Sequence, residues 1–140
     1  MLNKTKVNVL PCSGIGKAFG TISRWAAFEI KENLKPENAE LLCLARLVTG
    51  DDESVAKVHH NYNITIDGCS KRCAYKHLLE KDAEVSKSFL VAKFLVKNRD
   101  LKVNTRNVSD PGQDGQQLAK RIGIEISELI DELVSVHGEA

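Results

Sequence analysis

The feature that most constrains this fold is an alternation of short apolar runs with helical patterns over the first hundred residues. Apolar or β-branched runs of strand length occur at 6–10, 39–44, 63–66 and 85–90. The segments between them carry apolar residues three or four positions apart, the spacing of a helix that buries one face. Strands that alternate with helices form a parallel sheet with right-handed connections and helices on both faces. The sequence therefore predicts an α/β protein, with a three-layer α/β/α fold and a mostly parallel sheet of about four strands.

The connecting segments predict where the helices begin and end. The first helix is expected at 14–33, where apolar residues recur at helical spacing. A short second helix is expected after Asp51 or Asp52, because either carboxylate can accept a hydrogen bond from the first helical turn. Ser70 is expected to cap a third helix that runs to about Lys81.

The last third of the chain predicts a polar loop and one long helix. A helical turn or two is expected after the fourth strand, followed by a loop at 101–115 with turn-forming residues. Apolar residues then recur every three or four positions over 118–136, which predicts a long amphipathic helix. We expect a single domain over 1–140, with a core at about 6–98 and the C-terminal loop and helix at 101–137.

The charge and the apolar runs exclude two classes of partner. Lys and Arg total 20 and Asp and Glu total 19, so no basic surplus exists to neutralise a nucleic-acid backbone. No stretch has the length or composition of a membrane span or a secretory leader, so we expect no membrane partner and a cytoplasmic location. Because the cytoplasm is reducing, the four cysteines are expected to be metal ligands or reactive thiols. Any protein partner is left open.

The four cysteines follow the ends of predicted strands. Cys12 lies just past the first strand, Cys43 lies at the end of the second, and Cys69 and Cys73 follow the third. The carboxyl ends of parallel strands share one edge of the sheet, where such folds bind their ligands. If the first three strands are neighbours, in the order 2-1-3 or 1-2-3, the four sulfurs are expected to converge.

A cluster of four thiolates suits zinc. Zinc binds four thiolates tetrahedrally at about 2.3 Å, often through a local pair separated by two to four residues. Cys69 and Cys73 have that separation, whereas the other two ligands would come from distant segments, unlike a zinc finger. One zinc ion with four thiolates carries a net charge of about −2. Basic side chains near the cysteines can offset this charge: Lys17, Arg46, Lys71 and Arg72.

Other interpretations of the cysteines stay open. Cys43 in its apolar run can be a small buried hydrophobe. Cys12 or Cys69 can be a nucleophile with Cys73 as the resolving thiol, or the cysteines can hold a labile metal or an iron–sulfur cluster. A phosphatase is disfavoured, because Ala18 stands where an arginine would bind the phosphate. A nucleotide-binding loop is disfavoured too, since the chain lacks its long glycine-bounded loop.

Neighbouring residues suggest supporting roles. His77 lies one helical turn after Cys73 and is either a further ligand or an ordinary boundary histidine. Asp67 is expected to fix the turn that follows it by accepting backbone hydrogen bonds. Gly68 is expected to supply an unusual backbone angle or a close approach. The segment Gly14–Lys17, at the expected start of the first helix, is a candidate site for a small anion.

The chain resembles the DGC-domain family, named for an Asp-Gly-Cys motif that stands here at 67–69. The motif is followed by Cys73 and Ala74 and preceded by "PCSGIGK" and by "CLA" at 43–45, so the resemblance covers about 6–98. Many relatives have proline after the motif, where this chain has Ser70, and either residue suits the start of a helix.

The resemblance implies a zinc-binding protein and no particular reaction. It implies one ion chelated by four cysteines, which match Cys12, Cys43, Cys69 and Cys73. The alternative is a thiol redox or sulfur-handling enzyme or carrier that uses Cys12, Cys69 and Cys73. Whether the protein is an enzyme is left open.

Overall fold

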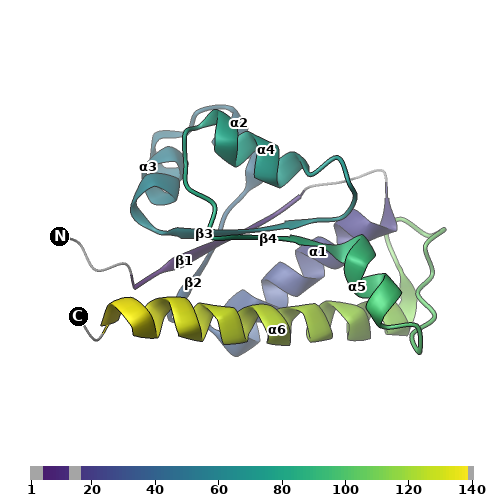
Figure 1. Ribbon diagram of the computed structural model, residues 1–140. Helices are drawn as coiled ribbons and strands as arrows, with labels where there is room; N and C mark the ends of the chain where they lie inside the picture. The colour runs from purple at the N-terminus through teal and green to yellow at the C-terminus, as the bar shows by residue number, and fades with distance from the viewer. Residues whose placement is uncertain (1–4, 13–16, 139–140) are drawn as a thin grey trace.

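In the computed structural model, which describes residues 5–12 and 17–138, helices cover both faces of a four-stranded sheet (Figure 1). All neighbouring strands are parallel, in the order β2-β1-β3-β4. The strands are β1 (Val7–Pro11), β2 (Ala39–Leu41), β3 (Tyr62–Asp67) and β4 (Lys87–Leu90). The predicted α/β class is confirmed, and the observed order 2-1-3 is one of the two that the sequence left open.

The helices divide between the two faces. α2, α3 and α4 lie on one face, and α1, α5 and α6 lie on the other (Figure 1). Their bounds are α1 (Ala18–Glu29), the π-helical turn η1 (Ile30–Leu34), α2 (Leu44–Val48), α3 (Asp52–His60), α4 (Cys73–Glu80), α5 (Val91–Lys97) and α6 (Gly112–Gly138). Gly14 to Gly16, where the first helix was expected to begin, lie outside the described residues. Among the described residues, no helix combines the length and apolar character that a bilayer span needs.

The two central strands, β1 and β3, contribute buried side chains to the hydrophobic cores on both faces of the sheet. Every residue of β1 and β3 is buried, as expected of parallel strands covered on both faces. Val9 and Ile64 belong to the larger core beneath α1 and α6, whereas Leu10 belongs to a second core with α2, α3 and α4. The predicted C-terminal helix is confirmed and is longer than expected, since α6 begins at Gly112 inside the predicted loop. Its fully buried side chains are Leu118, Ile122, Ile126 and Ile130.

The second strand is shorter than predicted. The apolar run at 39–44 suggested a strand covered on both faces, but β2 has three residues and lies at the edge of the sheet. The Leu42 N–H still donates to the Val9 carbonyl, at 3.1 Å, and the chain then leaves the sheet. Leu42 and Leu44 are buried in the second core instead, and α2, which was not predicted, follows at once.

A buried asparagine pair joins β1 to β3 and to the layers around them. Asn8 and Asn63 are register partners, and Asn8 Nδ2 donates to Asn63 Oδ1 at 2.9 Å. Asn63 Nδ2 in turn donates to the Val58 carbonyl at 2.7 Å and the Glu84 carbonyl at 2.8 Å. The Asn63 side chain therefore donates hydrogen bonds to backbone carbonyl groups near the end of α3 and in the segment before β4.

We expect Asn63→Ala to lower the free energy of unfolding by about 2 to 4 kcal/mol, because it leaves buried polar groups without partners. The control is Asn33→Ala, whose exposed side chain donates to the nearby Glu29 and whose loss should cost about 0.5 kcal/mol or less. Urea unfolding curves of both variants measure the difference. Equal midpoints for the two variants would contradict a stabilising role for the asparagine pair.

Candidate functional site

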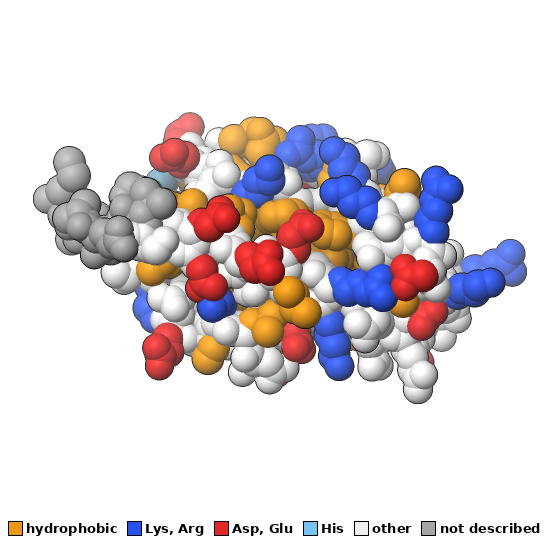
Figure 2. Space-filling view, turned by 60° about the horizontal axis from the view of Figure 1, so that its bottom comes forward, with side chains coloured by type: hydrophobic (Ala, Val, Ile, Leu, Met, Phe, Trp, Pro, Cys, Tyr) orange, Lys and Arg blue, Asp and Glu red, His pale blue; other side chains and the backbone are white. Residues whose placement is uncertain are grey.

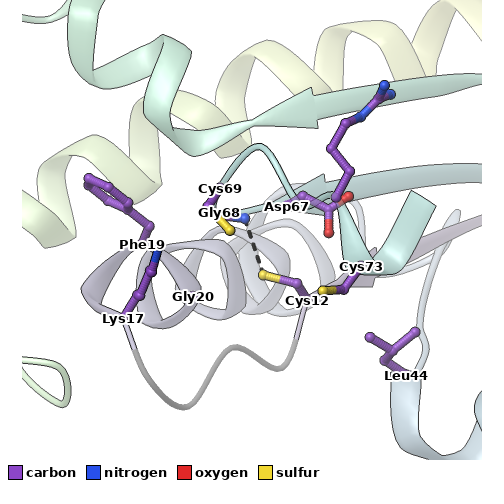
Figure 3. A pocket seen from close by; sticks show the side chains of 10 residues that line it. Cys12, Lys17, Phe19, Gly20, Leu44, Asp67, Gly68, Cys69 and Cys73 are labelled. Carbon is purple, nitrogen blue, oxygen red and sulfur yellow. Dashed lines mark hydrogen bonds between the residues drawn. The ribbon is translucent and has the colours of Figure 1, made fainter. Parts of the chain in front are cut away.

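A cavity of about 390 Å³ lies beyond the carboxyl ends of β1 and β3, where parallel α/β sheets place their ligand sites (Figure 3). Its walls come from the end of β1, the start of α1, the β3–α4 turn and the start of α2. The lining residues are Cys12, Lys17, Phe19, Gly20, Leu44, Asp67, Gly68, Cys69, Arg72 and Cys73.

Three of the four cysteines meet at this cavity. Cys12 is buried, Cys69 is half-buried and Cys73 is exposed. Figure 3 shows their sulfur atoms between Lys17 and Phe19 on one side and Leu44 on the other. The structure thus brings Cys12 to the distant local pair of Cys69 and Cys73, and the role of these sulfurs as metal ligands stays a prediction.

Cys43 lies apart from the other three cysteines. It is exposed and lines a neighbouring cavity of about 250 Å³ with Pro11 and Phe28. The register explains this separation: Val9 pairs with Leu41, so continuing along both chains sets Cys43 beside Pro11 and Leu44 beside Cys12. Because adjacent residues of extended chain point to opposite faces, Leu44 rather than Cys43 lines the three-cysteine cavity.

The sulfur positions do not form a closed ligand set. Within 5–12 and 17–138, no three His, Cys, Asp or Glu side chains are grouped closely enough to hold a metal ion. A metal bound in the cavity therefore requires the side chains of its cysteines to move toward one another.

The Cys12 sulfur is held by polar groups. Gly68 donates its backbone N–H to Cys12 Sγ at 3.1 Å, and the Ser23 hydroxyl lies 3.4 Å from the same sulfur. Ser23 is completely buried on α1, and its hydroxyl also lies 2.6 Å from the Gly20 carbonyl. The N–H that Gly68 aims at the sulfur fixes the position of Cys12 Sγ at the cavity. The sequence analysis missed Ser23, whose signal was a small polar residue on the apolar face of a helix.

Asp67 caps the N-terminus of α4, as predicted in outline. Its Oδ1 accepts from the Ala74 N–H at 2.8 Å and its Oδ2 accepts from the Tyr75 N–H at 3.2 Å. Burial raises the pKa of Asp67 above its ordinary value, although these hydrogen bonds and the charge of Arg72 act to lower it. The predicted Ser70 cap is wrong, because this buried carboxylate satisfies the first helical N–H groups and α4 begins only at Cys73.

Gly68 permits a close approach between the β3–α4 turn and α1. A Cβ atom at this position would lie 2.9 Å from both the Gly20 nitrogen and the Phe19 carbonyl carbon, closer than such atoms can pack. The close approach predicted from the sequence is confirmed. It brings the Gly68 N–H onto the Cys12 sulfur.

The basic residues are only partly where they were expected. Lys17 and Arg72 line the cavity, whereas Lys71 does not and Arg46 pairs with Asp51 at 3.0 Å. The Arg72 backbone is left-handed, with φ of 52°. Its guanidinium donates to the Ser88 hydroxyl at 2.8 Å and lies 3.9 Å from the centre of the Tyr75 ring.

Two other expected residues contribute less. His77 is half-buried, and its Nδ1 lies 3.1 Å from Glu80 Oε2 rather than at the cavity. Of the predicted anion site at Gly14–Lys17, only Lys17 falls within the described residues, so that site stays a prediction.

We expect Gly68→Ala to lower the free energy of unfolding by about 1 to 3 kcal/mol, because the added methyl group would push against the α1 backbone. Gly123→Ala is the matched control. There the nearest atom is the flexible Leu34 Cδ1 at 3.3 Å, and alanine in a helix should be neutral or stabilising by about 0.5 to 1 kcal/mol. Thermal or urea unfolding of both variants measures the contrast, which equal losses would contradict.

Comparison with known proteins adds one finding to this geometry. A family model described as the DGC domain matches residues 8–124, which is most of the chain. The searches of curated proteins and of solved structures found no match to the chain. The matched span contains all four cysteines and the Asp67-Gly68-Cys69 motif, whose three residues cap α4, permit the approach of α1 and line the cavity. The chain therefore belongs to the DGC domain family.

Proposed function

We propose that this protein binds one zinc ion through cysteine thiolates at the cavity beyond β1 and β3. The observation that carries the proposal is that Cys12, after β1, and the local pair Cys69 and Cys73, after β3, line one cavity. The donor set fits zinc in kind, because thiolates are soft ligands that favour zinc, copper(I) and iron–sulfur clusters over hard cations. Membership in a family that the sequence resemblance associates with zinc chelation supports zinc among these.

The three cavity cysteines are the ligands on which the proposal depends. Cys43, the fourth ligand implied by the family resemblance, lies in the neighbouring cavity and would have to turn past Leu44 to join them. A four-cysteine site thus requires a rearrangement at the start of α2. A three-cysteine site requires only that side chains already at the cavity move closer.

The surrounding residues fit the charge of such a site. A bound zinc ion would supply a link between the end of β1 and the β3–α4 turn, a structural role. Three or four thiolates exceed the charge of one zinc ion, and Lys17 and Arg72 at the cavity can offset the excess. The Gly68 N–H orients the Cys12 sulfur by the hydrogen bond it donates.

The test replaces one cysteine at a time with serine and measures zinc content after purification and zinc affinity by chelator competition. We expect Cys12→Ser, Cys69→Ser and Cys73→Ser each to lower zinc affinity strongly, because each removes a ligand. Cys43→Ser decides between the two ligand sets: it lowers the affinity only if this residue is the fourth ligand. Full zinc content in any of the first three variants would overturn the proposal.

Chelation provides an independent measurement on the unchanged chain. Structural zinc in small peptides contributes on the order of 10 kcal/mol to folding. Here both hydrophobic cores consist mainly of aliphatic side chains, although Cys12 belongs to the second core, so zinc removal should lower the melting temperature without unfolding the protein at room temperature. An unchanged melting temperature after confirmed zinc removal would contradict a structural zinc ion.

Thiol redox or sulfur-handling chemistry is the second candidate function. It is favoured by the unequal exposure of the sulfurs: Cys12 is buried and hydrogen-bonded, while Cys73 is exposed at the first residue of α4. In this scheme a thiolate attacks a small disulfide, releases one thiol and forms a mixed disulfide that a second cysteine resolves. Mass spectrometry of Cys73→Ser treated with oxidised glutathione should then show an accumulated mixed disulfide. Its absence in every single-cysteine variant would exclude this function.

A further inference from the structure

The three-cysteine cavity is larger than a metal ion needs. Its volume of about 390 Å³ falls in the range of small-molecule sites. With a water molecule taking about 30 Å³ of liquid, this volume holds on the order of ten non-hydrogen atoms. The space beyond the sulfurs is therefore that of a small organic molecule.

The charges facing the cavity favour an anion. Lys17 is exposed at its rim and forms no ion pair within the described part of the chain. Asp67 is the one acidic residue in the lining, and both of its oxygens already accept hydrogen bonds from α4. Arg72 donates to Ser88 and lies over the Tyr75 ring, and its charge acts on the carboxylate of Asp67. The opposite charges of Arg72 and Asp67 thus offset each other, and within the described residues Lys17 is left to receive a ligand with a single negative charge.

The remaining walls are apolar. The half-buried Phe19 stands beside Lys17, and the buried Leu44 stands at the opposite side of the hollow (Figure 3). Carbon and sulfur atoms make up most of the surface between them. A strongly hydrated, multiply charged anion such as phosphate would lose its water there against mostly apolar walls, which is unfavourable.

We infer that this cavity binds a small organic monocarboxylate with an apolar tail. The carboxylate pairs with Lys17, and the tail lies between Phe19 and Leu44 beside the sulfurs of Cys69 and Cys73. The inference shares its cavity with the proposed zinc site but does not depend on a bound metal.

The experiment measures protection of individual cysteines on the metal-free, reduced full chain. Iodoacetamide alkylates a thiolate sulfur with loss of iodide, and peptide mass spectrometry gives the rate at each cysteine. Hexanoate should slow alkylation of Cys69 and Cys73 several-fold and saturably, while exposed Cys43 in the neighbouring cavity keeps its rate. Acetate should protect less, because it lacks the tail. Hexanamide and inorganic phosphate should not protect.

Two variants and a control test the named contacts. Lys17→Gln should abolish protection by hexanoate, whereas Lys120→Gln, a lysine on α6 that lines a different cavity, should preserve it. In Phe19→Leu, confirmed as folded by its melting curve, the difference in protection between hexanoate and acetate should become smaller. Three results would overturn the inference: hexanamide protects as well as hexanoate, Cys43 is protected as much as Cys69 and Cys73, or hexanoate still protects the Lys17→Gln variant. Zinc affinity is measured separately on the cysteine variants, so either result can fail while the other holds.

Discussion

The site depends on the parallel pairing of β1 with β3. Their register sets Pro11 beside Ile66, and the Cys12 N–H continues the ladder by donating to the Ile66 carbonyl at 2.9 Å. Both strands are fully buried, so this register is held by the two cores on either side. Cys12 and the turn after β3 therefore leave the sheet next to each other, and the cavity opens where they part.

Each residue of the Asp-Gly-Cys motif performs a different physical task in that turn. The Asp67 carboxylate satisfies the first N–H groups of α4, which fixes where this helix begins. Gly68 has no side chain, so α1 can come within contact of the turn while the Gly68 N–H reaches the Cys12 sulfur. Cys69 lines the cavity, and α4 then adds Cys73 as its first residue. The motif thus assembles the cavity as well as contributing a sulfur to it.

The sulfurs at the cavity differ in their surroundings, and so do the chemistries they suit. Cys12 is enclosed by Gly68 and Ser23, which favours a fixed role as an anchoring ligand or an oriented sulfur. Cys69 and Cys73 are progressively more exposed and are open to a ligand or a reagent. The zinc proposal and the carboxylate inference use different parts of this cavity: its sulfurs in one case, and Lys17 with its apolar walls in the other.

The sequence by itself determined the α/β class, the long amphipathic helix and the gathering of strand-end cysteines at one edge, because these follow from periodicity and from the shared direction of parallel strands. It could not place the end of β2: an apolar run pairs in a sheet or packs in a core equally well, and here Leu42 and Leu44 pack in the second core. That choice and the β1–β2 register set Cys43 on the face away from Cys12. Only the tertiary structure decided where β2 ends, where Cys43 lies, and that Asp67 rather than Ser70 caps α4. Each of these features depends on which distant residues pack against a short segment, and the sequence of that segment does not contain this information.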